Sequence, residues 1–426
     1  MGYPSLKIAV AAMSFLAVTS ALPLFAQEAP TPAPAPPRQG ARQFIGEPPD
    51  PSHPTMAIGA PLPSFSLPGI DGKMHTQADY ANAKLLVIVF ESNHCPVSIA
   101  YEERIKDLYE KYKNKGVALI AVNPNNPSAV QLSELGYTDA SDSQEEMKVR
   151  AKLRHIDWPY LYDGETQSFS SAVGAAATPH IFIFDQDRKL RYQGRIDDST
   201  DVRKVTKHDA HDAIEALLAG QPVAVPSTPH FGCSTKWLTK STGVKEELAK
   251  IQAAPVSLTP ANLDDVKKLR ANAEDKTVVI VFWSTKCREC LDEMLGYQNT
   301  YRMYRRRKFD LVTVSTDSPA DSDKVLSVLK QQYASTTNLQ FNSGDIKALQ
   351  EAVGETWKAN TPFVMVLGPG GHVVYQKAGA ADILDVRRNV LASIPNDGPW
   401  FGVQEYWTDV IKASSEGKNK ASSSGE

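Results

Sequence analysis

Two short runs of hydrophobic residues, far apart along the chain, predict the two strands around which the rest is organised. They are Leu85–Phe90 and Val278–Phe282, and both are rich in β-branched residues. Continuous apolar runs of this length are typical of buried strands. A short polar turn and then a helical pattern follow each run. The pattern therefore predicts two strand–turn–helix units in one chain.

Further strands, turns and helices are expected around both units. Turn chemistry predicts hairpins at Ile70–Lys73 and at Gly368–Gly371. The other expected strands are Val117–Val122, Leu190–Gly194, Phe309–Val314 and Val373–Tyr375, and the expected helices are Glu145–Leu153, Asp209–Leu218, Val325–Tyr333 and Ile383–Ile394. Strands that alternate with helices in this way indicate the α/β class.

Two cysteines, Cys287 and Cys290, follow the second apolar run with two residues between them. On the first turn of a helix, the sulfur of Cys287 can lie over unpaired backbone N–H groups, which favour the thiolate. Cys290 lies one turn further on and can resolve a mixed disulfide formed by Cys287. A zinc site would need a second ligand pair, and the chain has four cysteines in all. A static structural disulfide is the other alternative.

The second unit resembles the active site of thioredoxin-like proteins, in which a strand ending in Phe-Trp runs into a Cys-X-X-Cys helix. The first unit can be laid on it without a gap. Phe90 matches Phe282, Cys95 matches Cys287, and Ser98 stands where Cys290 stands. The resemblance implies two tandem thioredoxin-like folds, each a central mixed sheet flanked by helices, over about 57–397.

Two Thr-Pro dipeptides, Thr178-Pro179 and Thr361-Pro362, each precede an apolar strand and resemble the cis-proline loop of the thioredoxin fold. A cis proline there removes a backbone donor and lays the preceding backbone beside the cysteine, where a substrate chain can pair with it. We therefore expect these four residues to shape substrate grooves. A trans proline that opens an edge strand is the alternative.

The first half also resembles the alkyl hydroperoxide reductase/thiol-specific antioxidant redoxins in its opening segment, Gly59–Lys73. Its last part, Phe231–Trp237, resembles the tail of a redoxin subgroup that ends in Gly-Cys-Ser-X-Lys-Trp. Since Ser98 cannot resolve a disulfide, Cys233 is the expected partner of Cys95 in the oxidised state. This pair is either catalytic or structural, and the nucleophile position of Cys95 favours catalysis.

A thiol peroxidase based on Cys95 is a second hypothesis. The active-site motif of peroxiredoxins is Pro-X-X-X-Thr/Ser-X-X-Cys, with an arginine far along the chain. Ser92 fits the hydroxyl position, Ile88 stands where the proline should be, and Arg195 is the candidate for the peroxide-orienting arginine. We expect His94 to be exposed and to favour the Cys95 thiolate when protonated, with a surface histidine of no role as the alternative.

The second unit departs from thioredoxins in two ways. Thioredoxins keep a buried acid in the strand, six positions before the first cysteine, and here Val281 and Val89 hold those places. Arg288 and Glu289 replace the Gly-Pro pair between the cysteines. Arg288 favours a Cys287 thiolate and Glu289 opposes it, so the two residues leave the direction of electron transfer open.

The N-terminus has the features of a secretory signal over residues 1–26. Lys7 supplies the positive charge, Ile8–Leu22 is mostly apolar, and Ala26 is a small residue at the expected cleavage point. An uncleaved anchor is the alternative. Export would place the protein in the bacterial periplasm or outside the cell, where disulfides persist.

The expected domain boundaries follow from these segments and from composition. We expect a signal peptide at 1–26, a Pro-rich disordered linker at 27–56, a first redoxin domain at 57–238, a linker at 239–255, a second domain at 256–397 and a polar, disordered tail at 398–426. The 426 residues are enough for several well-packed cores.

Composition and charge narrow the function. Hydrophobic residues make up 42% of the chain and charged residues 22%, as in soluble globular proteins. A net charge of -3 argues against nucleic acid as a partner. The sequence predicts an exported thiol–disulfide oxidoreductase that acts on protein or small-molecule thiols and disulfides, and on peroxides in the peroxidase alternative. No organic cofactor and no metal is implied. A binding protein built from degenerate redoxin folds is the third hypothesis.

Overall fold

The computed structural model describes residues 50–354, 357–396 and 402–423. The predicted signal segment and residues 27–49 of the predicted Pro-rich linker lie outside the described residues. In the described part, no helix combines the length and the hydropathy that a membrane span needs.

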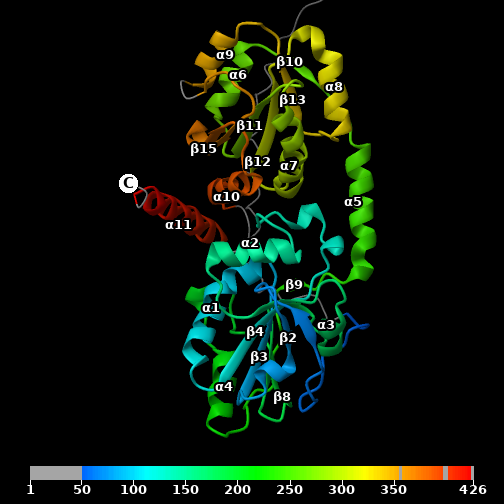
Figure 1. The fold of residues 1–426 in the computed structure, drawn as a ribbon, viewed down its shortest axis with the longest axis vertical. Coiled ribbons are helices and arrows are strands. Elements are labelled where there is room, and N and C mark those ends of the chain that lie inside the picture. The colour runs from blue at the N-terminus through cyan, green and yellow to red at the C-terminus, as the bar shows by residue number, and fades with distance from the viewer. Residues whose placement is uncertain (1–49, 355–356, 397–401, 424–426) are drawn as a thin grey trace, which may run out of the picture. The chain divides into compact units, whose positions relative to one another are not determined.

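A five-stranded mixed sheet forms the centre of the first half (Figure 1). Its strands, in spatial order, are β5 (Tyr160–Tyr162), β4 (Val117–Asn123), β3 (Leu85–Phe90), β7 (His180–Phe184) and β8 (Leu190–Gly194). The first three run parallel, and β7 is antiparallel to both of its neighbours, β3 and β8. Two small antiparallel pairs accompany the sheet: β1 (Ser66–Pro68) with β2 (Met74–Thr76), and β6 (Ala177–Thr178) with β9 (Cys233–Ser234).

Helices cover both faces of this sheet, which explains why β3 is apolar at every position. The helices are α1 (Pro96–Tyr112), α2 (Gln144–Arg154), α3 (Ser168–Val173) and α4 (Asp209–Leu218). Val87 and Val89 belong to the apolar cluster that contains residues of α1 and α4. Ile88 and Phe90 belong to a separate cluster with Phe169 of α3. Successive side chains of a strand point to opposite faces, so both faces of β3 are buried.

The second half repeats this plan with one more strand. Its six-stranded sheet has the order β10 (Thr259–Ala261), β13 (Thr337–Phe341), β12 (Phe309–Ser315), β11 (Thr277–Trp283), β14 (Phe363–Leu367) and β15 (Val373–Ala378). The helices are α5 (Ser241–Ala253), α6 (Leu263–Ala271), α7 (Arg288–Tyr304), α8 (Ser322–Gln331), α9 (Ile346–Val353), α10 (Ile383–Ser393) and α11 (Val403–Ser423).

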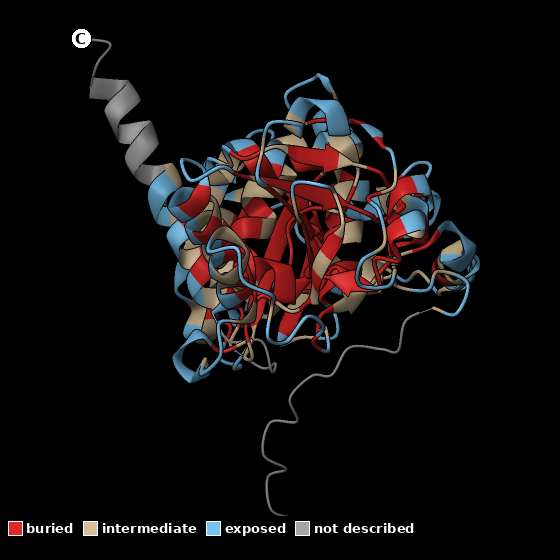
Figure 2. Cartoon of the chain, turned by 90° about the horizontal axis from the view of Figure 1, so that it is seen from below, coloured by how far each residue is buried: buried red, intermediate tan, exposed pale blue. Residues whose placement is uncertain are grey.

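Short 3₁₀ turns complete both halves: η1 (Gln77–Tyr80), η2 (Pro127–Ala129), η3 (Leu132–Glu134), η4 (Val202–Lys204), η5 (Leu238–Lys240), η6 (Pro319–Asp321) and η7 (Pro369–Gly371). Figure 2 shows the buried residues concentrated in the strands and on the helix faces that cover them.

The predicted α/β class and its two strand–turn–helix units are confirmed. Every strand and helix expected from the pattern is present, with ends that move by a few residues. The Thr178–Pro179 and Thr361–Pro362 bonds are both cis, as predicted. The predicted linker at 239–255 contains helix α5.

The prediction of a disordered tail after residue 397 is wrong for the part that the structure describes. Helix α11 begins at Val403, and its apolar residues recur at the i, i+3, i+4 and i+7 positions that form one helix face. These residues are Val403, Tyr406, Trp407 and Val410, and they are buried in one cluster with Val386 and Val390 of α10. Because most residues of the tail are polar, its average composition does not reveal these four regularly spaced apolar positions.

We predict that Trp407→Ala destabilises the protein. Trp407 is fully buried, and its indole Nε1–H donates to the Tyr137 carbonyl oxygen at 3.0 Å. Removing so large a buried side chain costs about 3–5 kcal/mol. Urea unfolding followed by tryptophan fluorescence and circular dichroism measures the loss. Leu295→Ala, which truncates an exposed side chain on α7, is the matched control, and equal effects of the two substitutions would contradict a packed α11.

Candidate functional site

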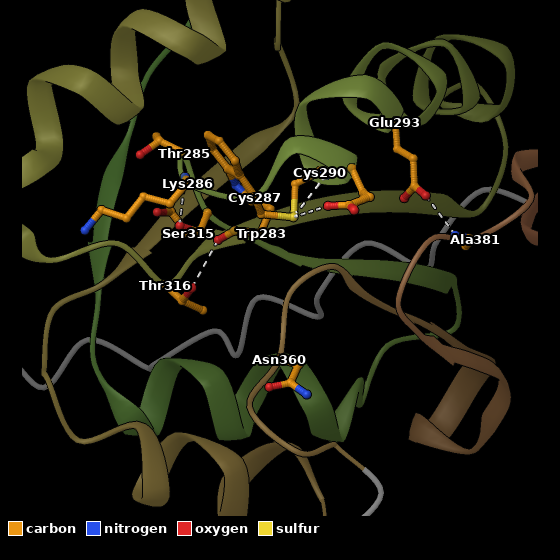
Figure 3. Close-up of a disulfide and its surroundings, with 12 residues drawn as sticks. Trp283, Thr285, Lys286, Cys287, Cys290, Glu293, Ser315, Thr316, Asn360 and Ala381 are labelled. Atoms are coloured by element: carbon orange, nitrogen blue, oxygen red, sulfur yellow. Dashed lines mark hydrogen bonds between the residues drawn. A yellow bond between two sulfur atoms is a disulfide. The ribbon is translucent and has the colours of Figure 1, made fainter.

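The second half carries a disulfide between Cys287 and Cys290 at the start of α7 (Figure 3). Cys287 is the residue before the helix, and the Cys290 backbone N–H donates to its Sγ at 3.1 Å. The predicted placement of Cys287 over free helix N–H groups is therefore confirmed. Cys287 is half-buried, whereas Cys290 is 3% exposed. An incoming thiol can therefore reach Cys287 more readily than Cys290.

The charges beside Cys287 are unequal in position. The Glu289 carboxylate oxygen lies 4.0 Å from the Cys287 Sγ. The Arg288 side chain is 91% exposed and pairs with Asp292 at 3.8 Å. Arg288 is expected to favour the Cys287 thiolate and Glu289 to oppose it. In the structure, the opposing Glu289 carboxylate is the charge that lies close to the sulfur.

A buried aspartate, Asp317, holds the turn that precedes Cys287. Its carboxylate accepts hydrogen bonds from the Thr285 backbone N–H and hydroxyl, both at 2.8 Å. The hydroxyls of Ser284 and Ser315 also donate to it, at 3.0 and 2.9 Å. Burial alone would raise the pKa of Asp317. The combined effect of these hydrogen bonds is larger and opposite, so the pKa lies below its ordinary value.

The first half has the corresponding cysteine, Cys95, immediately before α1 and fully buried. Its thiol donates to the Thr178 carbonyl oxygen at 3.0 Å. The Ser92 and Thr178 hydroxyls are 3.0 Å apart. Cys233 lies opposite Thr178 in the pairing of β6 with β9. The structure therefore brings together the cysteines and the Thr-Pro loop of this half, and both cysteines are free thiols in it.

The prediction that His94 is exposed is wrong. His94 is 2% exposed, and its Nδ1 is hydrogen-bonded to Asp142. Asp142 is itself fully buried and accepts from the Asn93 backbone N–H at 2.8 Å and from the Asn125 side chain at 3.0 Å. The other ring nitrogen of His94, Nε2, is buried without a hydrogen-bond partner.

These neighbours shift the pKa values of the thiols of Cys95 and Cys233 in opposite directions. Burial alone would lower the pKa of His94. The effect of Asp142 is larger and opposite, so the pKa lies above its ordinary value. Burial raises the pKa of Cys95, but the hydrogen bond with Cys233 and the charge of His94 lower it below its ordinary value. The hydrogen bond to Cys95, together with burial, raises the pKa of Cys233. Cys95 is therefore the thiol that ionises first.

The other candidates have different surroundings. Arg195 pairs with Asp209 at 2.7 Å, so its guanidinium is committed to the start of α4. In the second half, Phe363 pairs with Phe282, which places the Thr361-Pro362 loop at the end of β11. Among the described residues, no three His, Cys, Asp or Glu side chains gather as metal ligands.

Each half of the chain matches a protein-family model. Residues 57–214 match the family model described as Redoxin. Residues 246–376 match the model described as the AhpC/TSA family. Both halves are redoxin-type domains. The predicted recognition of two tandem redoxins is thus confirmed, although the AhpC/TSA model matches the second domain and not the first, to which we assigned that resemblance.

Solved structures of other proteins resemble parts of the chain. A hypothetical protein from Sinorhizobium meliloti is 31% identical, with a TM-score of 0.39 over 43% of this chain and 96% of its own. An uncharacterized conserved protein from Geobacillus kaustophilus is 36% identical, with a TM-score of 0.38 over 42% of this chain and 92% of its own. A putative thiol:disulfide interchange protein from Chlorobium tepidum is 16% identical, with a TM-score of 0.29 over 39% of this chain and 98% of its own. No curated protein matches the chain.

Sequence reasoning missed the two aspartates that support the redoxin sites. The strand pairing equates Val122, opposite Phe90, with Val314, opposite Phe282. Asn125 of the first domain therefore occupies the position of Asp317, and Asp142 reaches the site from the segment that follows. A count from the strand end could have found Asp317, but nothing local in the sequence marks Asp142.

Proposed function

We propose that the chain is an exported thiol–disulfide oxidoreductase. The family matches support a redox function, and the Cys287–Cys290 pair at the start of α7 is the observation that carries the more specific proposal. Export is proposed from residues 1–26 alone, and N-terminal sequencing of the exported chain, expected to begin near Gln27, checks it.

In the second domain, exchange runs through Cys287. The reduced Cys287 thiolate attacks one sulfur of a substrate disulfide, forms a mixed disulfide and releases one substrate thiol. The Cys290 thiolate then attacks the Cys287 sulfur and releases the second substrate thiol. The substrate disulfide gains two electrons, and the Cys287–Cys290 disulfide forms. The same steps in reverse oxidise a substrate dithiol.

We predict that Cys290→Ser traps substrates and Cys287→Ser does not. Without the resolving thiol, the mixed disulfide at Cys287 has no intramolecular route to collapse. Both substitutions are made together with Cys95→Ser and Cys233→Ser, and reduced proteins are mixed with oxidised insulin. Non-reducing electrophoresis and mass spectrometry should show a disulfide adduct at Cys287 and none at Cys290. Adducts of equal yield on either cysteine would contradict the assignment of roles.

In the first domain, Cys95 is the proposed nucleophile and Cys233 resolves it. The peroxidase alternative uses the same two residues: the Cys95 thiolate attacks a peroxide oxygen and becomes a sulfenic acid as the alcohol leaves with a proton. The Cys233 thiol then displaces water and forms the disulfide. The lowered pKa of Cys95 favours this alternative, whereas Arg195 is paired with Asp209 and Ile88 replaces the expected proline. Consumption of peroxide by the Cys287→Ser/Cys290→Ser chain tests it.

We predict that Asp142→Asn moves the ionisation of Cys95 to higher pH. Without the carboxylate, His94 is less often protonated, and an imidazolium near the sulfur is one of the groups that lower the Cys95 pKa. Two further charged side chains near this pair are Lys236, which opposes protonation of His94, and Glu134, which is paired with Lys236. The Cys95 thiolate should therefore form only at a higher pH than in the parent chain.

The measurement is the pH dependence of iodoacetamide alkylation of Cys95 in the Cys233→Ser/Cys287→Ser/Cys290→Ser chain. Each unit of pKa shift lowers the rate about tenfold below the pKa. Asp163→Asn is the control, because Asp163 is also buried but its carboxylate accepts from the backbone N–H and hydroxyl of Ser170 in α3. A uniform loss of rate at every pH, or the same profile in both variants, would contradict the role of Asp142.

A further inference from the structure

The tail of the first domain pairs as a strand with the loop that sequence reasoning assigned to substrates. Strand β9 (Cys233–Ser234) runs antiparallel to β6 (Ala177–Thr178), with Cys233 opposite Thr178. Thr178 is also the residue whose carbonyl accepts from the Cys95 thiol. The backbone edge beside the nucleophile is therefore already paired, and a cysteine occupies the position facing it.

The pairing is close and allows no side chain at one point. A Cβ atom on Gly232 would lie 2.1 Å from the Thr178 carbonyl oxygen, so only glycine fits there. On the other side of the cysteine, the Thr235 backbone N–H and hydroxyl donate to the carbonyl oxygens of Ala176 and Ala175, at 3.1 and 2.6 Å. The segment thus follows the groove on both sides of Cys233.

The end of the tail is fixed to the body of the domain. The Lys236 backbone N–H donates to the Asn125 side chain at 2.8 Å, and its carbonyl accepts from the Asn126 N–H at 3.0 Å. The Lys236 ammonium pairs with Glu134. Trp237 is buried and stacks on His53, with the ring centroids 3.8 Å apart. These contacts secure the strand without involving either thiol.

The second domain differs at the same place. In its described residues, no strand pairs with Thr361, the residue before the equivalent proline. Cys287 is half-buried, whereas Cys95 is fully buried. The first redoxin site is therefore covered by a strand of its own chain, whereas none of the described strands covers the second.

We propose that Phe231–Trp237 is a resident pseudo-substrate, which fills the strand-binding edge of the first domain and holds Cys233 where the cysteine of an extended polypeptide would lie. An added strand gains its affinity from main-chain hydrogen bonds, and here the tail already makes them. The edge suits an extended, cysteine-containing polypeptide, but only small disulfides or oxidants reach Cys95 while the tail is seated. This inference rests on the proposed exchange chemistry of Cys95.

The test compares two reagents on a full-length chain in which Cys95 is the sole thiol, made by Cys233→Ser, Cys287→Ser and Cys290→Ser. One reagent is the small disulfide of thionitrobenzoate. The other is an unstructured ten-residue peptide whose single cysteine carries thionitrobenzoate. In both reactions the Cys95 thiolate forms a mixed disulfide and thionitrobenzoate leaves, so absorbance gives both rates. The measured quantity is the ratio of the peptide rate to the small-disulfide rate.

Gly232→Val and Trp237→Ala are added separately to loosen the tail. Each should raise the ratio at least tenfold. Val225→Ala is the matched control, since Val225 is exposed, precedes the paired segment and should leave the ratio unchanged. A synthetic peptide of residues 231–237 with Cys233→Ser, added in excess to a loosened variant, should lower the ratio toward that of the parent. An unfolded chain would not respond to this peptide.

An unchanged ratio in both loosened variants, or a raised ratio that the synthetic peptide does not lower, would overturn the pseudo-substrate proposal while leaving the exchange chemistry of Cys95 intact. If Cys95 reacted with neither reagent in any variant, the proposed function of this site would fail, and the pseudo-substrate proposal with it.

Discussion

A buried carboxylate fixes the turn before each cysteine motif, and both redox sites depend on it. Asp142 accepts from the backbone N–H groups of Asn93 and His94, and Asp317 accepts from that of Thr285. A buried charge is stable only when it is well hydrogen-bonded, and each aspartate has several donors. The turn supplies the donors that stabilise the buried carboxylate. The carboxylate in return holds the turn that leads into the helix and its cysteine.

The two domains meet this requirement differently, and the difference changes their chemistry. Asp317 lies two residues after the end of β12 and accepts from three hydroxyl groups, so it positions the turn. Asp142 comes from beyond the strand and contacts a histidine as well, which couples it to the charge of the neighbouring thiol. The first domain thus has a buried, charge-tuned cysteine under its own tail, and the second has a more exposed cysteine beside an acidic residue.

The parts of this arrangement that follow from local sequence were predictable. Strands buried on both faces show as continuous apolar runs, and the cysteine and Thr-Pro motifs sit at their ends, so β3, β11 and both loops could be placed. The rest depends on contacts distant in sequence. His94 is buried and hydrogen-bonded to Asp142, which lies 48 positions away. The apolar stripe of α11 occupies four positions in a polar segment, and it is stable because α10 covers it.

The central claim is that the four cysteines form two separate pairs, each within its own redoxin domain. Peptide mapping by mass spectrometry of the fully oxidised, non-reduced protein, with free thiols blocked before digestion, tests this most directly. The account predicts Cys95 linked to Cys233 and Cys287 linked to Cys290, and no other linkage. Cys95 joined to Cys287 or Cys290, or Cys95 and Cys233 both recovered as blocked thiols, would contradict it.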